Sequence, residues 1–253
     1  MSVVSSSSSL CHVLQEDPEL ADAIPSDRRT RALEECTAPE LSLQPGRWGG
    51  RGSLGFRGGI GVLVLNGLMI RRVGIDGRFG AELIGEGDLL RPDEESVSPL
   101  LPLSTDWTIV LPTRLAALDV QFEQHLADYP ELGRSLIARA LHRSKNLSVN
   151  MAIVHQARVD IRLHMLLWHL AARWGRVRSD GTVLRLRLTH SVLADLVAAR
   201  RPTVTTALSD LARRGLVKTD GETWVLSGEA PGDLLAFARE ASRRSDRTEK
   251  PPA

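Results

Sequence analysis

Residues 188–217 read LTHSVLADLVAARRPTVTTALSDLARRGLV, and the spacing of their apolar side chains predicts two short helices joined by a tight turn. Thr189 can cap the first helix by accepting a hydrogen bond from a backbone N–H. Arg201-Pro202 suits the start of the second helix, because proline has no N–H to lose there. The inner stripe of the second helix recurs at i, i+4 and i+7 and consists of Val204, Leu208 and Leu211.

The opposite side of this second helix carries small polar and basic side chains, which are Thr203, Thr205, Thr206, Ser209 and Arg213. Arg200 and Arg201 stand at its N-terminus, where the helix dipole attracts phosphate. The major groove of DNA is about 12 Å wide and admits a helix with modest exposed side chains. Threonine hydroxyls can bond base edges or phosphates, and an arginine can take guanine O6 and N7. The pattern predicts a helix-turn-helix that binds double-stranded DNA.

The flanks of this stretch extend the prediction to a winged helix-turn-helix over residues 158–228. Upstream, Val159–Trp174 has the period of an amphipathic helix. Gly175 and Asp180-Gly181 then mark a turn and a short hairpin, which is expected near Val183–Leu188. Downstream, Gly215 is a helix stop. Two short strands, Leu216–Lys218 and Thr223–Leu226, then flank an Asp220-Gly221 turn and form the predicted wing.

Residues 121–157 are predicted to form a linker and a long helix that begins at Pro130 and ends near His155. A helix of this length spans roughly 38 Å. Its apolar positions fall near one face and include Leu132, Leu136, Ala140, Leu147, Met151 and Val154. A long helix with such a stripe often pairs with its own copy, so we expect a homodimer. Packing of this helix on its own β domain is the alternative.

Residues 41–120 have the texture of a β domain. Glycines are frequent, and between them lie apolar runs of strand length: Ile60–Leu65, Met69–Val73 and Thr108–Leu111. Asp76-Gly77 between two such runs is a hairpin signal. Many short strands at close spacing favour a β-barrel or jelly-roll.

The two ends of the chain are predicted to be loosely ordered. Residues 1–40 contain a serine run and scattered prolines, and we expect a flexible tail with one helix near Arg28–Cys36. Its two cysteines, Cys11 and Cys36, are expected to be free thiols in a weakly ordered segment. Residues 229–253 are expected to form a C-terminal helix and tail.

Composition excludes several classes of function. The chain has 253 residues, of which 42% are hydrophobic, and no apolar run approaches the roughly 20 residues that span a bilayer. We therefore expect a cytoplasmic protein without a signal peptide or a membrane partner. Residues 41–118 contain no histidine, so a metal-dependent cupin enzyme is disfavoured, and two cysteines are too few for an iron–sulfur cluster. We expect no enzyme activity, no metal site and no cofactor.

Charge divides the chain into two parts of opposite sign. From His155 onward, 17 Lys and Arg residues face 11 Asp and Glu residues, whereas the preceding part holds 15 against 20. The asymmetry indicates that the C-terminal part faces an anion.

The 188–217 stretch, together with WHLAARWG at 168–175, resembles the C-terminal domain of Crp/Fnr-type transcription regulators. The resemblance implies an α+β fold with an N-terminal β-roll (jelly-roll-like) sensor domain, a long dimerisation helix and a C-terminal winged helix-turn-helix. It also implies that Arg201 reads guanine and that Thr189 and Ser191, with His190 between them, contact the DNA backbone. Pro202 and Thr206 stand where the family has a frequent glutamate and a base-contacting arginine, so the operator is expected to differ from the family's standard one.

The same resemblance places an effector site in the β domain. Family members that bind cyclic nucleotides use a glutamate for the ribose hydroxyl and an arginine for the cyclic phosphate. The nearest match here provides Gly80, Glu82 and Leu83 within Phe79–Gly85, followed by Arg91. The segment after Arg91 is acidic and repels phosphate, so we expect no binding of cyclic AMP in the usual manner.

Three interpretations of function remain open at this stage. The first is a DNA-binding transcription regulator with a degenerate effector domain, an inverted-repeat operator and RNA polymerase as a further partner. The second is a regulator that responds to a cyclic nucleotide through a divergent pocket. An unknown small-molecule effector is a further candidate partner. The third is a winged helix used only for contacts with proteins.

Overall fold

The structure is a computed structural model that describes residues 9–49, 59–76, 78–92, 103–219 and 223–231. The chain divides into two compact units, residues 1–148 and 149–253, and each is described by itself. The division falls within a long helix, α5 (Pro130–Val154), whose bounds confirm the predicted helix from Pro130 to about His155. No helix among the described residues is both long and apolar enough to cross a membrane.

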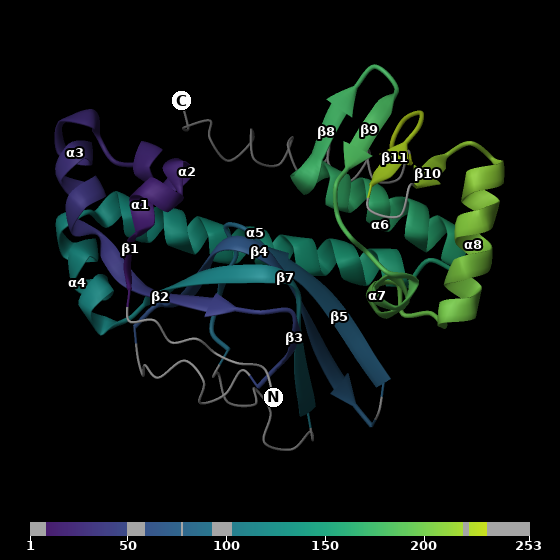
Figure 1. The fold of residues 1–253 in the computed structure, drawn as a ribbon, viewed down its shortest axis with the longest axis horizontal. Helices are drawn as coiled ribbons and strands as arrows, with labels where there is room; N and C mark the ends of the chain where they lie inside the picture. Colours follow the sequence, from purple (N-terminus) through teal and green to yellow (C-terminus); the bar gives the residue numbers. More distant parts are fainter. Residues whose placement is uncertain (1–8, 50–58, 77, 93–102, 220–222, 232–253) are drawn as a thin grey trace, which may run out of the picture. The chain divides into compact units, whose positions relative to one another are not determined.

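An antiparallel sheet of seven strands organises the first unit (Figure 1). Its main path runs β1 (Leu10–His12), β2 (Thr37–Leu43), β7 (Leu103–Leu118), β4 (Gly61–Ile75) and β5 (Arg78–Gly85). The short strand β3 (Gly46–Trp48) pairs with β7, and the short strand β6 (Leu89–Leu90) pairs with β4. The mixed helix and sheet architecture confirms the predicted α+β class.

Strand β4 joins two runs that the sequence predicted as separate strands, Ile60–Leu65 and Met69–Val73. Its pairing with β7 shifts register around Asn66 and Leu68, which marks a bulge between the two runs. Gly67 has a φ of 105°, and a Cβ there would lie 2.5 Å from the backbone oxygen of Pro112. Only glycine therefore suits this bend of the strand.

The predicted hairpin at Asp76-Gly77 is present between β4 and β5. Ile75 pairs with Arg78, and Asp76 adopts a φ of 51°, as a tight hairpin turn requires. Gly77 itself lies outside the described residues.

The N-terminal segment departs most from the prediction. Residues 9–40 contain β1, the start of β2 and three helices, which are α1 (Val13–Glu16), α2 (Pro18–Asp22) and α3 (Ser26–Glu35). Their buried side chains pack with Phe122 of α4 (Val120–Asp128) and with Leu132 and Leu136 of α5. A flexible tail over residues 1–40 was the wrong prediction for the described part, although the expected helix near Arg28–Cys36 is present. Helices of four and five residues are too short to show a period in the sequence.

The two cysteines belong to this core and not to a weakly ordered segment. Cys11 is 5% exposed and Cys36 is fully buried, and both are free thiols. Burial raises the pKa of each thiol to about 11, so both are held in the unreactive protonated form.

The second unit contains three helices and a four-stranded sheet. Helix α6 (Val159–Trp174) precedes the hairpin of β8 (Gly175–Arg178) and β9 (Gly181–Leu184). Helices α7 (His190–Leu196) and α8 (Arg201–Arg213) follow, and then β10 (Val217–Thr219) and β11 (Trp224–Leu226). The strand order is β10-β11-β9-β8.

The hairpins of this unit correct one prediction and confirm another. The first hairpin lies at 175–184, earlier than the predicted Val183–Leu188, and Ser179-Asp180 forms its turn. The wing is present as β10 and β11, while its Asp220-Gly221 turn lies outside the described residues. The expected C-terminal helix and tail also lies outside them from residue 232 onward.

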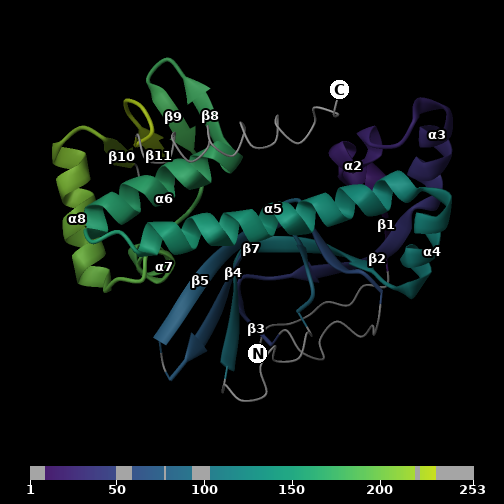
Figure 2. The ribbon, with the colours of Figure 1, turned by 180° about the vertical axis from the view of Figure 1, so that it is seen from behind.

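Helix α5 covers the sheet in the first unit. Viewed from behind, the middle of α5 passes in front of the sheet near β4 and β7 (Figure 2). Arg143 of α5 contacts Glu82 of β5, with Nε to Oε1 at 2.7 Å. The position of this helix matters for the candidate effector site.

Candidate DNA-binding surface

The connection between α7 and α8 is a tight turn with local support at both ends. Thr189 caps α7, because its side-chain oxygen accepts a hydrogen bond from the N–H of Val192 at 3.3 Å. At the other end of α7, Ala198 adopts a φ of 49° and the N–H of Ala199 bonds the carbonyl of Ala194 at 2.9 Å. The predicted cap and turn are confirmed.

Helix α8 begins where Arg201-Pro202 predicted. Arg200 is its N-cap, with extended backbone angles of −84° and 142°, and proline occupies the first turn. The predicted inner stripe is buried, and Ala207 joins it. These apolar residues hold α8 against α6 and α7, so that its other side faces outward.

The sequence-predicted DNA-contacting residues lie on the outward surface of α7 and α8. The exposed members are Thr189, Ser191, Arg200, Arg201, Pro202, Thr203, Thr205, Thr206, Ser209 and Arg213, and His190 is half-buried. One contact joins the two helices directly, since Nδ1 of His190 lies 2.9 Å from Oγ1 of Thr205. The structure thereby brings the start of α7 against the middle of α8.

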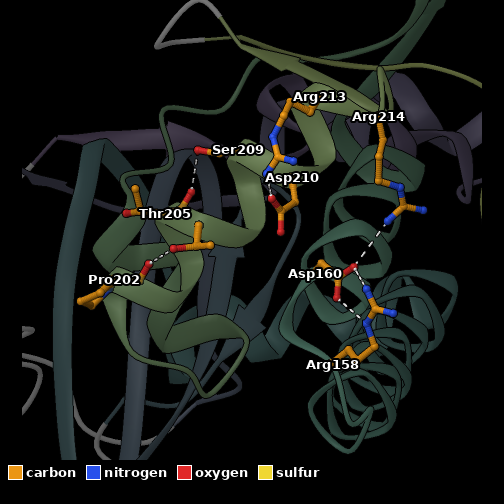
Figure 3. Close-up of polar contacts among 9 residues, drawn as sticks. Arg158, Asp160, Pro202, Thr205, Ser209, Asp210, Arg213 and Arg214 are labelled. Carbon is orange, nitrogen blue, oxygen red and sulfur yellow. Dashed lines mark hydrogen bonds and ion pairs between the residues drawn. The ribbon is translucent and has the colours of Figure 1, made fainter.

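The arginines of this surface fall into two groups. Arg200 and Arg201 make no side-chain hydrogen bond or ion pair with another residue in the described part of the chain. Arg213 instead pairs with Asp210 on the same helix (Figure 3). The start of α8 therefore offers two guanidinium groups that remain available to an anion or a base edge.

A carboxylate that the sequence did not single out anchors the far end of α8. Asp160, near the start of α6, accepts from Arg158 at 2.7 Å and lies 3.4 Å from Arg214, just after α8 (Figure 3). The hydrogen bond from Arg158 lowers the pKa of Asp160, so the carboxylate stays ionised. No sequence signal reveals this pairing, because Asp160 and Arg214 are 54 residues apart.

Arg162, also on α6, supports the turn between α7 and α8. Its Nη1 donates to the carbonyl of Val197 at 3.1 Å, and its Nε donates to the carbonyl of Gln156 at 2.6 Å. The side chain thus connects the segment before α6 to the turn that aims α8. Arginine is suited to this role because its fork can bond two carbonyls at once.

A surface hollow of about 490 Å³ lies along one side of α8. It is lined by Arg158, Val159, Asp160, Pro202, Thr203, Thr206, Ala207 and Asp210. Both carboxylates among these residues, Asp160 and Asp210, are paired with arginines.

The predicted effector residues lie in the first unit and are engaged within the protein. Glu82 is 7% exposed, and its two carboxylate oxygens accept from Nε and Nη2 of Arg143 at 2.7 and 2.9 Å. Arg71 adds an ion pair to the same carboxylate at 3.0 Å. Arg91 donates to the backbone oxygen of Gly59. The side chains of Glu82 and Arg91 are thus committed to different partners.

Gly80 and Leu83, the other two predicted effector residues, belong to strand β5. Gly80 pairs with Val73 of β4, and Leu83, which is buried, pairs with Ile70. Arg71 and Arg143 are contacts of Glu82 that the sequence prediction missed.

Comparison with known proteins agrees with this geometry. Residues 161–230 match the model of the Crp-like helix-turn-helix domain. The CRP-like cAMP-activated global transcriptional regulator of Mycobacterium tuberculosis (strain ATCC 25618 / H37Rv) is 30% identical over 173 residues, which are 66% of this chain and 74% of that protein. The global nitrogen regulator of Nostoc sp. (strain PCC 7120) is 34% identical over 105 residues, 41% of this chain and 46% of that protein.

Solved structures share the fold. A CooA mutant from Carboxydothermus hydrogenoformans gives a TM-score of 0.61 at 14% identity and covers 89% of this chain and 94% of its own. FixK2 from Bradyrhizobium japonicum gives a TM-score of 0.55 at 17% identity, and the match covers 76% of this chain and 93% of FixK2. The chain belongs to the Crp-like family of transcription regulators, and its C-terminal unit carries the family's helix-turn-helix DNA-binding domain.

Proposed function

We propose that this regulator binds an inverted-repeat operator as a homodimer and reads bases through α8. The observation that carries the proposal is the pair of exposed guanidinium groups at the start of α8, Arg200 and Arg201, beside a face of small hydroxyl side chains. In a dimer, two such helices would meet successive major grooves about 34 Å apart. Thr189 and Ser191 at the start of α7 supply further polar groups for the phosphate backbone.

Salt-dependent binding of duplex DNA tests this function. The full chain should bind duplexes selected from a random pool, with an affinity that falls steeply as salt rises, because counterions are released from DNA. Arg201→Ala should weaken binding of the selected duplex by about 1–3 kcal/mol and relax the preference at one base position. Arg31→Ala removes one positive charge from the first unit and serves as the matched control. A chain that ignores every duplex at low salt would refute the proposal.

The proposed partners are double-stranded DNA, a second copy of the chain and RNA polymerase. The last of these rests on membership of a family of transcription regulators. Retention of RNA polymerase on an operator-bound complex, in a binding assay with purified components, tests it.

We further propose that the β domain does not take cyclic AMP in the family's usual way. The Mycobacterium tuberculosis relative is a cAMP-activated regulator, so cyclic AMP is the first ligand to consider for this chain. What supports the proposal is Glu82, whose two oxygens already hold the guanidinium groups of Arg71 and Arg143. A ribose hydroxyl at Glu82 would have to compete with charge-assisted hydrogen bonds, which are among the stronger kinds. Binding of a cyclic nucleotide in a divergent pocket is the alternative.

A further inference from the structure

Three hydroxyl side chains on the outward side of α8 are hydrogen-bonded to their own helix. We call them the hydroxyl face: Thr205, Thr206 and Ser209. Each donates to the carbonyl four residues earlier, at 3.1, 3.3 and 3.0 Å respectively. Figure 3 shows the bonds to the carbonyls of Pro202 and Thr205. This back-bonding is common for Ser and Thr in helices, and it occupies the single proton that each hydroxyl has.

A hydroxyl whose proton is already engaged in a hydrogen bond can take part in a further hydrogen bond only as the acceptor. Its oxygen keeps lone pairs, and on an exposed side chain these point toward whatever the helix meets. Thr205 is engaged further, because its Oγ1 also lies 2.9 Å from Nδ1 of His190. Thr206 and Ser209 therefore present the available acceptor oxygens of the hydroxyl face.

The surroundings of Thr206 hold a second hydrogen-bond acceptor. Asp210 lies one helical turn further on and lines the same hollow as Thr206. Its carboxylate is also an acceptor, although it already pairs with Arg213. Arg201, at the start of α8, can only donate hydrogen bonds, because a guanidinium has five N–H donors and no acceptor.

Base edges in the major groove also differ in whether they donate or accept hydrogen bonds. Adenine and cytosine offer exocyclic amino donors, whereas guanine and thymine offer carbonyl acceptors at the corresponding places. We propose that Thr206 and Ser209 select amino-bearing bases, adenine or cytosine, over guanine or thymine on the strand they approach, while Arg201 selects guanine. The inference rests on the proposed function, since it assigns specificity to α8 as the helix that enters the groove.

A selection with isosteric variants tests this assignment. The full chain, Thr206→Val and Ser209→Ala are each used to select duplexes from a random pool, and Thr206→Ser serves as the control that keeps the hydroxyl. The wild type and Thr206→Ser should favour adenine or cytosine at a strand position by about 3- to 10-fold, the worth of one hydrogen bond. Thr206→Val should lose that preference while still binding DNA.

A base analogue then identifies the atoms. At the position that Thr206→Val changes, the favoured base is replaced by an analogue without its exocyclic amino group. The wild type should lose affinity by the same factor, and Thr206→Val should be indifferent to the replacement.

Two results would overturn the inference. One is a wild type that prefers guanine or thymine at the positions altered by Thr206→Val or Ser209→Ala, and the other is that neither variant alters any position. Failure of the proposed function gives a different result, because the wild type would then bind no duplex at any salt concentration.

Discussion

Ala198 holds a left-handed backbone conformation at the turn that aims α8, with a φ of 49°. Alanine pays a steric cost of roughly 1–2 kcal/mol in this region, because its Cβ approaches the following carbonyl oxygen. The side chain of Ala198 is exposed. A single residue in this turn therefore stores strain next to the DNA-binding helix.

Ala198→Gly should raise the free energy of unfolding by about 1 kcal/mol, because glycine adopts this φ without the steric cost. Thermal unfolding of the full chain measures the change. The neighbouring Ala199, which does not have a positive φ, provides the control, and Ala199→Gly should be destabilising instead. Equal effects of the two substitutions would contradict the assignment of strain to Ala198.

Glu82 is the residue that would bind the ribose hydroxyl in the family's usual effector site. It stands between Arg71 and Arg143 and is buried, so its removal leaves two guanidinium groups without their shared anion. Glu82→Gln should lower the free energy of unfolding by about 3 kcal/mol, as expected when one partner of a buried ion pair is lost. The same charge change at the exposed Glu34 should have little effect.

Calorimetric titration of the wild type with cyclic AMP should show no saturable binding if Glu82 is engaged within the protein. Saturable binding that Glu82→Gln abolishes would instead place the ribose at this carboxylate, as in the family's usual pocket.

At the scale of elements, α6 is the helix that supports α8 from behind. Within it, Nε2 of His164 accepts a hydrogen bond from the indole N–H of Trp168 at 3.1 Å, which requires an unprotonated Nε2. Burial lowers the pKa of His164 below 6.5, and the nearby charge of Arg214 lowers it further, while Asp160 opposes the shift. Protonation of this histidine therefore breaks a hydrogen bond and places a charge in the helix packing.

The expected pH dependence follows from the direction of that shift. Between the ordinary histidine pKa and the lowered pKa of His164, the unfolded chain binds more protons than the folded chain, so stability falls as pH falls. His164→Gln should lessen the loss of stability between about pH 7 and pH 5, which denaturant titrations at several pH values measure. His142→Gln, at an exposed position of α5, is the control. An identical pH profile for wild type and His164→Gln would refute the role of His164.

For the whole molecule, the outward side of α5 carries large apolar side chains. Ile137 is 62% exposed and Leu141 is 60% exposed, and they are neighbours one helical turn apart. The inner side of the same helix is already used, since Leu132 and Leu136 are buried in the first unit. A second copy of α5 is the partner that we propose for this outward side, as in a two-helix seam.

Light scattering of the full chain should give the mass of a dimer. Replacement of both Ile137 and Leu141 by Asp should shift it to the monomer, because two carboxylates would have to be buried without partners. Val120→Asp changes another exposed apolar residue, 51% exposed, and should leave the dimer intact. A dimer that survives the double substitution would place the interface elsewhere.

The second unit was largely predictable because its signals are local. A cap at Thr189, a proline after Arg201 and an i, i+4, i+7 stripe act within one or two helical turns, and each is found where the sequence placed it. The N-terminal segment was not predictable in this way. Leu14, Leu20 and Ile24 are buried, yet they lie on helices or turns too short to show a period, and their partners on α4 and α5 are about 100 residues away.

The helix-turn-helix and the position of α8 therefore follow from the sequence, because local hydrogen bonds and apolar periodicity specify them. The family follows from the resemblance of residues 168–175 and 188–217 to known regulators. The tertiary fold was needed to show what the polar groups do once they are brought together. Glu82 meets Arg143 across 61 residues, and Asp160 meets Arg214 across 54. Ion pairs have no period and no required spacing along a chain, so which arginines stay available to DNA and which are held by carboxylates emerges only when the chain folds.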